Sequence, residues 1–282
     1  ILVTGALGNV GSEIIKCLQA EGKTVRAADI SVAAIRESFG TAVDAVPFDF
    51  TDSGTFPAAL DGIKRIFLMR PPHISNVQRD MFPFLDAAQE AGVELVVFLS
   101  LIGIEENQQV PHYKVEQYLK ASSMAFTFLR ASFFMQNLCG THQAEIRDRD
   151  EIFLPVGYGK TSFIDVRDIG AVGAKTLTES GHENKAYDLT GPEALDYYEV
   201  AKILSEVLGR EITYRDPSVP AFILRSLQQG TKVGMALVMS YLYTQTKRGM
   251  SDTVKDDVKK ILKREPILLK EFIVDHQQVW EL

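Results

Sequence analysis

The chain has 282 residues, of which 46% are hydrophobic and 24% charged, and this balance excludes disordered and fibrous proteins. The formal net charge of −7, from 30 basic and 37 acidic residues, argues against nucleic acid as a direct partner. Two cysteines, Cys17 and Cys139, cannot form a disulfide framework, and no apolar run approaches the roughly 18 residues of a membrane span. We therefore expect a cytoplasmic globular protein without a membrane partner.

The first half of the chain alternates short apolar runs with amphipathic segments. Strands are predicted at 1–4, 23–29, 45–49, 65–69, 94–100 and 126–130. Helices are predicted at 12–20, 33–39, 55–60, 76–91 and 112–122. This alternation is typical of an α/β protein with a Rossmann-type, doubly wound parallel sheet that is covered by helices on both faces.

The rhythm changes after about residue 150. Segments 151–155 and 161–165 are predicted as strands around the turn Gly157–Gly159; further strands are expected at 186–189 and 212–214, helices at 166–177 and 196–208, and mostly helix from Pro220 onward. We interpret residues 1–150, completed by about 163–190, as the Rossmann domain. Residues 151–162 and 191–282 would then form a small, mostly helical C-terminal cap that binds substrate.

A glycine-rich segment, Thr4–Gly11, follows the first strand and opens the first helix. Gly5 can make the tight turn, Gly8 lets the backbone approach a pyrophosphate, and Gly11 allows the helix to pack closely on the strand. The start of the helix offers free N–H groups and a partial positive charge to phosphates. A turn without a ligand is the alternative, but the strand–loop–helix context favours a dinucleotide. Its predicted contacts are Gly5, Ala6, Leu7, Gly8, Asn9 and Val10.

Asp29 ends the second predicted strand, roughly 20 residues after this loop, where an acid accepts hydrogen bonds from the adenosine ribose. Its carboxylate would repel a 2′-phosphate, and the next residue, Ile30, is not an arginine. NAD(H) is therefore favoured over NADP(H). The alternative is that Asp29 only caps the next helix, and Arg26 and Arg36 are the remaining routes to a 2′-phosphate.

Several motifs together resemble the NmrA-like family of atypical short-chain dehydrogenases/reductases, over nearly the whole chain. They are Thr4–Gly11 and the segments 49–52, 112–116, 128–137, 163–170 and 187–193. The family includes reductases of quinones and triphenylmethane dyes. The resemblance therefore implies an NAD(P)H-dependent oxidoreductase that transfers hydride to a small, aromatic or quinoid acceptor.

The resemblance also implies roles for single positions. Asp49 and Phe50 would lie against the adenine, and Lys114 matches the family's lysine that binds the nicotinamide ribose. The ends of the fourth, fifth and sixth strands would line the ribose and nicotinamide, through Met69, Arg70, Pro71, Leu99, Ser100, Ser132 and Phe133. This placement agrees with the rule that ligands bind beyond the C-terminal ends of parallel strands.

The general acid of the wider short-chain family, a tyrosine four residues before the lysine, is absent because Val110 stands there. Tyr113 is a poor substitute, since adjacent helix residues point in different directions. Hydride transfer needs no acid, only a nicotinamide C4 held about 3–3.5 Å from the acceptor carbon. An electron-poor acceptor can take hydride first, and water or His73 could then supply the proton. Candidate substrate contacts are Phe134, Asn137 and Tyr158.

Two alternatives stay open at this stage. One is an NAD(P)-sensing regulator that binds a protein partner and has little turnover. The other is a nucleotide-sugar epimerase, which the missing tyrosine disfavours. No grouping of His, Cys, Asp and Glu has metal-ligand spacing, so no metal site is expected.

Overall fold

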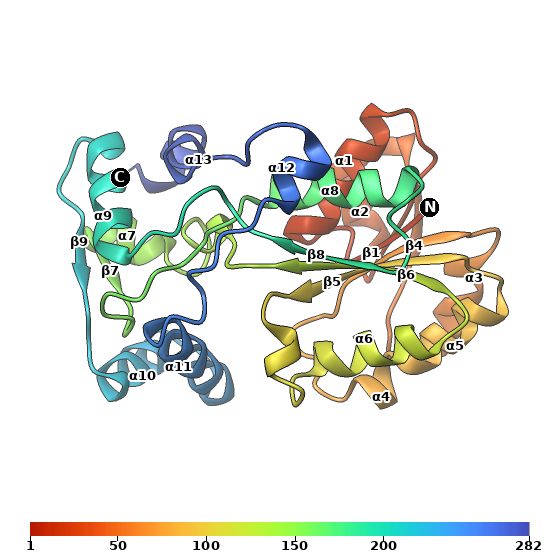
Figure 1. The fold of residues 1–282 in the computed structure, drawn as a ribbon, viewed down its shortest axis with the longest axis horizontal. Helices are drawn as coiled ribbons and strands as arrows, with labels where there is room; N and C mark the ends of the chain where they lie inside the picture. Colours follow the sequence, from red (N-terminus) through yellow and green to blue (C-terminus); the bar gives the residue numbers. More distant parts are fainter. Residues whose placement is uncertain (282) are drawn as a thin grey trace. The chain divides into compact units, whose positions relative to one another are not determined.

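A computed structural model describes residues 1–281, and the chain divides into two compact units (Figure 1). The sheet unit comprises residues 1–131, 166–189 and 260–263. The helical unit comprises residues 132–165, 190–259 and those from 264 onward.

The sheet unit is built on seven parallel strands in the order β3-β2-β1-β4-β5-β6-β8. The strands are β1 (Leu2–Thr4), β2 (Arg26–Asp29), β3 (Asp44–Pro47), β4 (Arg65–Leu68), β5 (Leu95–Leu101), β6 (Ala125–Ala131) and β8 (Lys185–Leu189). Every one of them overlaps a predicted strand. The predicted Rossmann-type α/β fold is therefore confirmed, and the C-terminal ends of β1, β2, β4 and β5 lie along one edge of the sheet.

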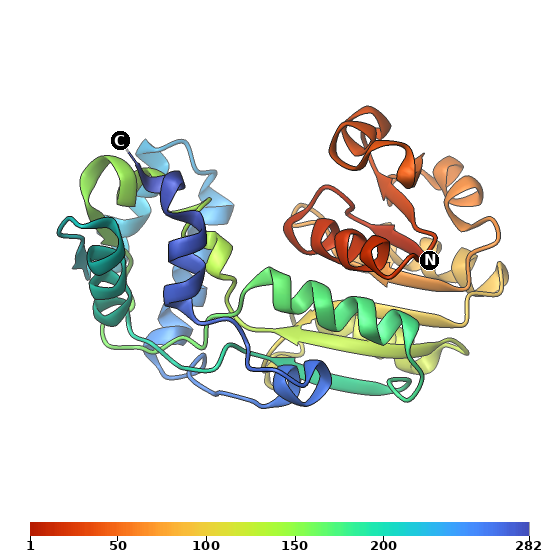
Figure 2. The ribbon, with the colours of Figure 1, turned by 90° about the horizontal axis from the view of Figure 1, so that it is seen from above.

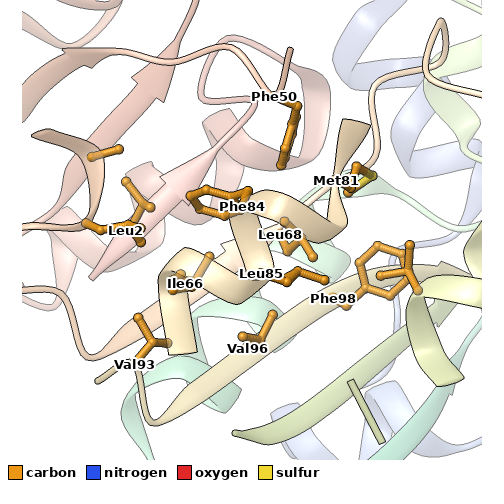
Figure 3. Packing of buried hydrophobic residues seen from close by; sticks show 14 of the residues in the cluster. Leu2, Phe50, Ile66, Leu68, Met81, Phe84, Leu85, Val93, Val96 and Phe98 are labelled. Carbon is orange, nitrogen blue, oxygen red and sulfur yellow. The ribbon is translucent and has the colours of Figure 1, made fainter. Parts of the chain in front are cut away.

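Helices cover both faces of this sheet. They are α1 (Asn9–Ala20), α2 (Val32–Phe39), α3 (Phe56–Leu60), α4 (Val77–Asp80), α5 (Phe82–Glu90), α6 (Pro111–Ala121) and α8 (Val166–Thr178), with 3₁₀ turns η1 (Gly40–Ala42), η2 (Ser53–Thr55) and η3 (Ile104–Glu106). Helices α1 and α8 lie side by side on one face (Figures 1 and 2). On the other face, side chains of α3 to α6 pack on the strands in an apolar core that includes Phe84, Leu68 and Phe98 (Figure 3).

The helix predicted at 76–91 is interrupted. Its first turn is α4, capped by the Asn76 side chain, and α5 begins after Met81. Pro83, at the start of α5, lacks the N–H that a continuous helix would need, so the chain bends there. Met81 is fully buried at the bend.

The helical unit contains α7 (Gln143–Arg149), α9 (Tyr197–Leu208), α10 (Val219–Gln228), α11 (Val233–Lys247), α12 (Asp257–Leu262), which runs into the sheet unit, and α13 (Leu269–His276). It also has two 3₁₀ turns, η4 (Met135–Asn137) and η5 (Gln277–Trp280), and a short parallel pair of strands, β7 (Glu151–Phe153) and β9 (Thr213–Arg215).

The two strands predicted around the turn Gly157–Gly159 are a wrong prediction in part. Strand β7 pairs with β9, whereas segment 161–165 forms only isolated bridges, of Thr161 with Leu195 and of Ile164 with Phe134. The turn itself packs on the end of α11, where a Cβ at Gly159 would lie 2.5 Å from the Thr246 carbonyl oxygen. The two segments therefore do not form a hairpin, and β7 pairs with β9 instead.

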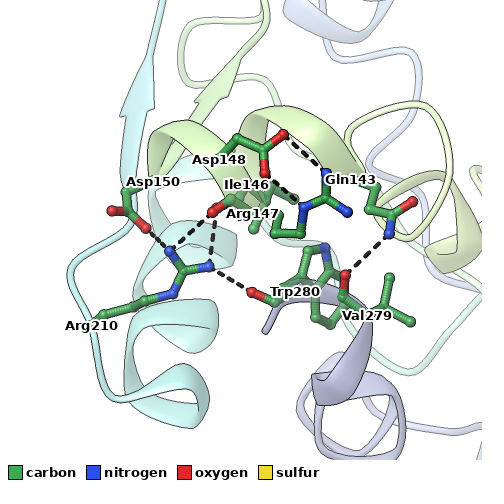
Figure 4. A network of polar contacts seen from close by, with 8 residues as sticks. All are labelled: Gln143, Ile146, Arg147, Asp148, Asp150, Arg210, Val279 and Trp280. Atoms are coloured by element: carbon green, nitrogen blue, oxygen red, sulfur yellow. Dashed lines mark hydrogen bonds and ion pairs between the residues drawn. The ribbon is translucent and has the colours of Figure 1, made fainter. Parts of the chain in front are cut away.

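Arg210 joins several parts of the helical unit (Figure 4). Its guanidinium pairs with Asp150 and donates to the carbonyl oxygens of Ile146 and Trp280, the latter at 2.9 Å. Since Trp280 is fully buried, this network fixes the end of the chain against α7. Among residues 1–281, no helix is both long enough and apolar enough to cross a bilayer.

Candidate active site at the strand ends

The glycine loop between β1 and α1 has a backbone that only glycine fits at two positions. Gly5 has φ +63°, and a Cβ there would lie 2.6 Å from the Met69 side chain. A Cβ at Gly11 would lie 2.2 Å from the Gly5 carbonyl oxygen, so Gly11 packs on the loop itself and not on the strand. Gly8 is less restricted, with 3.2 Å from its virtual Cβ to the same oxygen. The loop is thus a tight, open backbone surface.

Helix α1 presents its first N–H groups at this loop. The first helical hydrogen bond is donated by Ser12 to the Gly8 carbonyl, at 2.9 Å. The N–H groups of Asn9, Val10 and Gly11 precede that bond and have no helical acceptor. No acidic residue lies in the first turn, so the positive end of the helix dipole is not neutralised by the helix's own side chains. This arrangement suits an anion such as a pyrophosphate.

Asp29 is tied to the glycine loop. One carboxylate oxygen accepts a hydrogen bond from the Leu7 N–H at 3.1 Å, and the other accepts one from the Ile30 N–H at 2.8 Å. The side chain is half-buried, and Ile30 beside it is 71% exposed. The alternative that Asp29 only caps the next helix is wrong, because Ser31 caps α2 by accepting from the Ala34 N–H.

Arg26 is excluded as a route to a 2′-phosphate. It stands at the first position of β2, at the opposite end from the loop, and its Nε donates to Asp44 at 2.6 Å. It also donates to the carbonyl oxygen of Asp61, at 2.6 Å. Arg36 is exposed in the last turn of α2.

The predicted adenine contacts lie just beyond β3 and differ in exposure. The Asp49 carboxylate accepts hydrogen bonds from the N–H and hydroxyl of Thr51, both at 2.8 Å. Phe50 is only 6% exposed and packs edge-on against Phe48 and Phe84. Phe50 therefore belongs to the core, and Asp49 is the more accessible of the two.

Arg70 holds the turn that follows β4 through its hydrogen bonds. Its guanidinium donates to the carbonyl oxygens of Pro71 and Ile74, at 3.0 and 2.5 Å, and so closes the turn that holds His73. Its Nε donates to Nε2 of His112 at 3.4 Å. Burial, and then the charge of Arg70, lower the pKa of His112 to about 3. His112 is therefore neutral near pH 7, whereas His73 is exposed.

A buried ion pair joins α6 to β6, and sequence reasoning missed it. Glu116 on α6 is 1% exposed, accepts from the Ser100 hydroxyl at 2.7 Å, and pairs with Arg130 at 2.8 Å. Burial would lower the pKa of Arg130, but its bonds to Glu116 and Glu105 outweigh this effect and raise it. The sequence signal that could have indicated this pair is that Glu116 stands next to Val115 on the inner side of an amphipathic helix, where a charge needs a buried partner.

The Ser100 hydroxyl, which was expected to face the cofactor, is hydrogen-bonded to Glu116 of this pair instead. Ser100 is 1% exposed, while Leu99 before it is half-buried. The pair's effect is instead to lock α6 onto β5 and β6. That helix carries Lys114 in its first turn.

Lys114 is exposed and makes no ion pair or hydrogen bond among the residues that the structure describes. It lines a recess of about 400 Å³ on the surface of the sheet unit. The other lining residues are Gln78, Phe82, Gln108, Tyr113, Gln117 and Tyr118. The recess combines one unpaired cation with amides and aromatic rings, and Lys114 is free to bind an oxygen ligand.

The remaining predicted residues belong to the helical unit. The Ser132 hydroxyl lies 3.1 Å from that of Ser162, and Ser132 is 7% exposed. Phe133, Phe134 and Asn137 follow it along the chain and are half-buried. Tyr158 is 78% exposed and stacks on Tyr198, with ring centroids 5.0 Å apart.

Within the sheet unit, the structure brings together predicted residues from three strand ends. Leu7 contacts Asp29, and Met69 packs on Gly5, so the ends of β1, β2 and β4 meet directly. Cys139 is no candidate nucleophile, because burial raises the pKa of its thiol to about 12.

Comparisons with known proteins show relatives of this chain in sequence and in fold. The chain is 36% identical to an NAD(P)H azoreductase of Xenophilus azovorans, over 98% of this chain and 97% of that protein. Its fold is similar to that of a Citrobacter triphenylmethane reductase complexed with NADP(H), with TM-score 0.88, 23% identity and coverage of 98% and 99%. An NADPH-dependent quinone oxidoreductase of Escherichia coli, complexed with NADPH, gives TM-score 0.89 at 21% identity, with coverage of 98% and 99%.

The sequence model of the NmrA-like family matches residues 1–273. This match and the 36% identity confirm the resemblance predicted from the motifs. The chain belongs to the NmrA-like family.

Proposed function

We propose that the chain is an NAD(P)H-dependent oxidoreductase that transfers hydride to a small aromatic or quinoid acceptor. The observation that carries this proposal is the glycine loop, whose backbone and helix N-terminus are shaped for a pyrophosphate at the C-terminal edge of a parallel sheet. The azoreductase relative and the dye and quinone reductases of similar fold support the acceptor class.

A bound reduced nicotinamide would supply a hydride, that is one proton and two electrons, to an electrophilic atom of the acceptor. The protein's share is to position the ring and exclude water. Lys114, unpaired on α6, would donate to a ribose hydroxyl, as the family resemblance implies. The Glu116–Arg130 pair would hold α6 and so keep Lys114 in place.

The proton that completes reduction has few sources in the sheet unit. With a pKa of about 3, His112 carries no proton to give near pH 7, and the tyrosine of the wider family is replaced by Val110. His73 is exposed and could deliver a proton, as could water. A site of this kind suits acceptors that accept hydride before protonation, such as quinones and azo compounds.

We propose NADH as the preferred cofactor over NADPH. The anionic Asp29 lies at the end of β2, where its oxygens can accept from ribose hydroxyls but would repel a 2′-phosphate. Arg26 is held by Asp44 and cannot compensate. The two solved neighbours named above hold NADP(H) or NADPH, so this is the feature in which the chain would differ from those two.

The substrate side is assigned to the helical unit. Phe134, Asn137 and Tyr158 are proposed contacts of the acceptor, with Ser132 and Phe133 flanking the nicotinamide. The assignment follows from the family positions, and the half-buried phenyl rings offer apolar surface to an aromatic acceptor.

The test begins with calorimetric titration of NADH and NADPH. A panel of benzoquinones, naphthoquinones and azo dyes is then assayed by loss of absorbance of the reduced cofactor. We expect micromolar binding and acceptor-dependent oxidation that exceeds the enzyme-free rate. Binding without oxidation of any acceptor would instead favour the sensing alternative, and failure to bind either dinucleotide would refute the proposal.

A further inference from the structure

Helices α10 and α11 pack against each other in the helical unit (Figure 1). They carry an exposed apolar surface. Of the 17 large hydrophobic residues exposed among residues 1–281, nine lie between positions 219 and 247. We call these nine the hairpin face: Val219, Leu224, Leu227, Val233, Met235, Leu237, Val238, Tyr241 and Leu242. Clustering of this kind marks an interaction surface, because scattered single residues are the norm.

Helix α11 buries small and polar residues and exposes large apolar ones, which is the reverse of an ordinary surface helix. The residues it buries include the small or polar Ala236, Ser240 and Thr246. Large apolar side chains point outward instead, among them Leu237 and Val238, each 54% exposed. Helical geometry spreads the exposed positions 233–242 over roughly 200° of the helix circumference. A helix with this pattern leaves a wide apolar face unpaired within its own unit.

The helix pair itself carries only basic charges, although Asp216 and Asp252 flank it in sequence. Segment 217–251 contains four basic residues and no acidic residue, in a chain whose net charge is −7. Two of the four are paired with acidic residues, Arg225 with Glu151 and Lys247 with Asp216. Lys232 and Arg248 flank the two ends of α11, are exposed, and form no ion pair within the described part of the chain.

We propose that the hairpin face binds an anionic lipid surface. Exposed apolar side chains can enter the membrane interface, and unpaired lysine and arginine beside them strengthen binding to anionic lipids. The leucine and valine side chains would enter the boundary of the acyl chains, Tyr241 would sit at the headgroup level, and Lys232 and Arg248 would pair with lipid phosphates. At 15 residues, α11 lies on the bilayer and does not cross it.

A second copy of the chain fits this surface less well. If two hairpin faces met in an antiparallel arrangement, Lys232 of one copy would approach Arg248 of the other. In a parallel arrangement, Lys232 would approach Lys232 of the other copy, and Arg248 would approach Arg248. Since the segment holds no acid, both arrangements bring like charges together, which opposes association. An anionic surface removes that repulsion.

This inference departs from the expectation of no membrane partner, which rested on the absence of a spanning segment. It does not depend on the proposed reductase activity. If both hold, docking would give the protein access to acceptors that partition into lipid.

The test is flotation of the full chain with two kinds of vesicle, pure phosphatidylcholine and an equal mixture of phosphatidylcholine and phosphatidylglycerol. We expect binding to the anionic vesicles that is at least tenfold stronger than to neutral ones and that weakens with added salt. The double variant Leu237→Glu/Val238→Glu should lose binding. Charge reversal by Lys232→Glu/Arg248→Glu should weaken it at least about tenfold.

The matched control is Val274→Glu, an exposed apolar position on α13 outside the hairpin face, which should bind like the parent chain. Dinucleotide binding, measured in parallel, shows that each variant is folded and keeps the outcome separate from that of the reductase proposal. No vesicle binding overturns the inference. A stable dimer that the variant Leu237→Glu/Val238→Glu converts to monomer would also overturn it, because the face would then bind a second copy. Loss of acceptor turnover in that variant, when the parent chain binds no vesicle, would overturn it as well.

Discussion

The glycine loop and the hairpin face are two ways in which a protein can present a binding surface. The loop exposes backbone: Gly5 and Gly11 remove side chains so that N–H groups of α1 can reach an anion. The hairpin face exposes side chains, nine large apolar ones on two helices. The first surface needs particular residues at particular positions, whereas the second needs only that apolar residues remain outside. The loop is therefore the more sensitive to single substitutions.

The largest effect should come from the ion pair that holds α6. Replacing Glu116 by alanine leaves Arg130 buried without its main partner, which should lower the free energy of unfolding by about 3–5 kcal/mol. Urea unfolding measures the loss. Glu116→Gln retains an acceptor for Ser100 and should cost less.

The KM for the reduced dinucleotide distinguishes a role of Glu116 in stability from a role in positioning Lys114. If Glu116 positions Lys114, the KM for the reduced dinucleotide should rise in any Glu116 variant that still folds, while Lys114→Met raises it without destabilising the fold. A cost below about 1 kcal/mol for Glu116→Ala would contradict the buried geometry.

The next effect tests the loop itself. Gly8→Asp places a carboxylate beside the expected pyrophosphate and should weaken dinucleotide binding about 100-fold or more. Gly8→Asn has the same size without the charge and should lose much less. Calorimetric titration compares the two. Equal losses would mean that size and not charge is responsible, and unchanged affinity in a folded Gly8→Asp chain would show that no pyrophosphate binds there.

The contrast between the two surfaces also explains what could be predicted from sequence. The glycine spacing, the strand ends and Asp29 follow from local pattern, because each depends on residues close to it in the chain. The buried Glu116–Arg130 pair depends on strands β5 and β6 meeting helix α6, and neither residue alone signals a partner. Ser100 could likewise be placed at a strand end, but its partner Glu116 lies on α6 and is not indicated by the residues around Ser100.

The hairpin face could not be predicted from the sequence for a different reason. Residues 233–242 are apolar enough to be predicted as a buried helix, and only the folded chain shows that Ala236 and Ser240 are the residues turned inward. The pairing of β7 with β9 was missed similarly, because it joins two strands that are far apart in the chain.

A smaller effect should come from Asp29, the side chain that joins the loop to β2. Asp29→Asn keeps an oxygen that can accept from the Leu7 N–H but removes the negative charge. We expect the ratio of NADH to NADPH affinity to fall about tenfold, mostly through tighter NADPH binding. Asp29→Ala should relax the preference as well but also weaken NADH binding, since the loop loses a hydrogen bond. An unchanged ratio in both variants would remove Asp29 as the determinant of cofactor choice.

The smallest effect concerns pH, and each unit contains a histidine whose pKa burial lowers strongly. Burial lowers the pKa of His142 in the helical unit to about 4, and burial together with Arg70 lowers that of His112 in the sheet unit to about 3. Because an unfolded histidine titrates near 6.5, the unfolded chain binds more protons between that pH and the folded pKa, so acid favours unfolding. Stability from this source is complete above the unfolded pKa and falls as the pH drops below it.

Between pH 7 and pH 6 each histidine should account for less than about 1 kcal/mol of lost stability. His142→Gln keeps a group able to bond the Tyr243 hydroxyl, and His112→Gln keeps an acceptor for Arg70, so each variant should flatten the pH profile without a large change at pH 7. Urea unfolding at the two pH values measures the difference. If the two units unfold separately, each variant should flatten only the transition of its own unit, and flattening of both by His142→Gln would mean that the loop and the hairpin face belong to one cooperative structure.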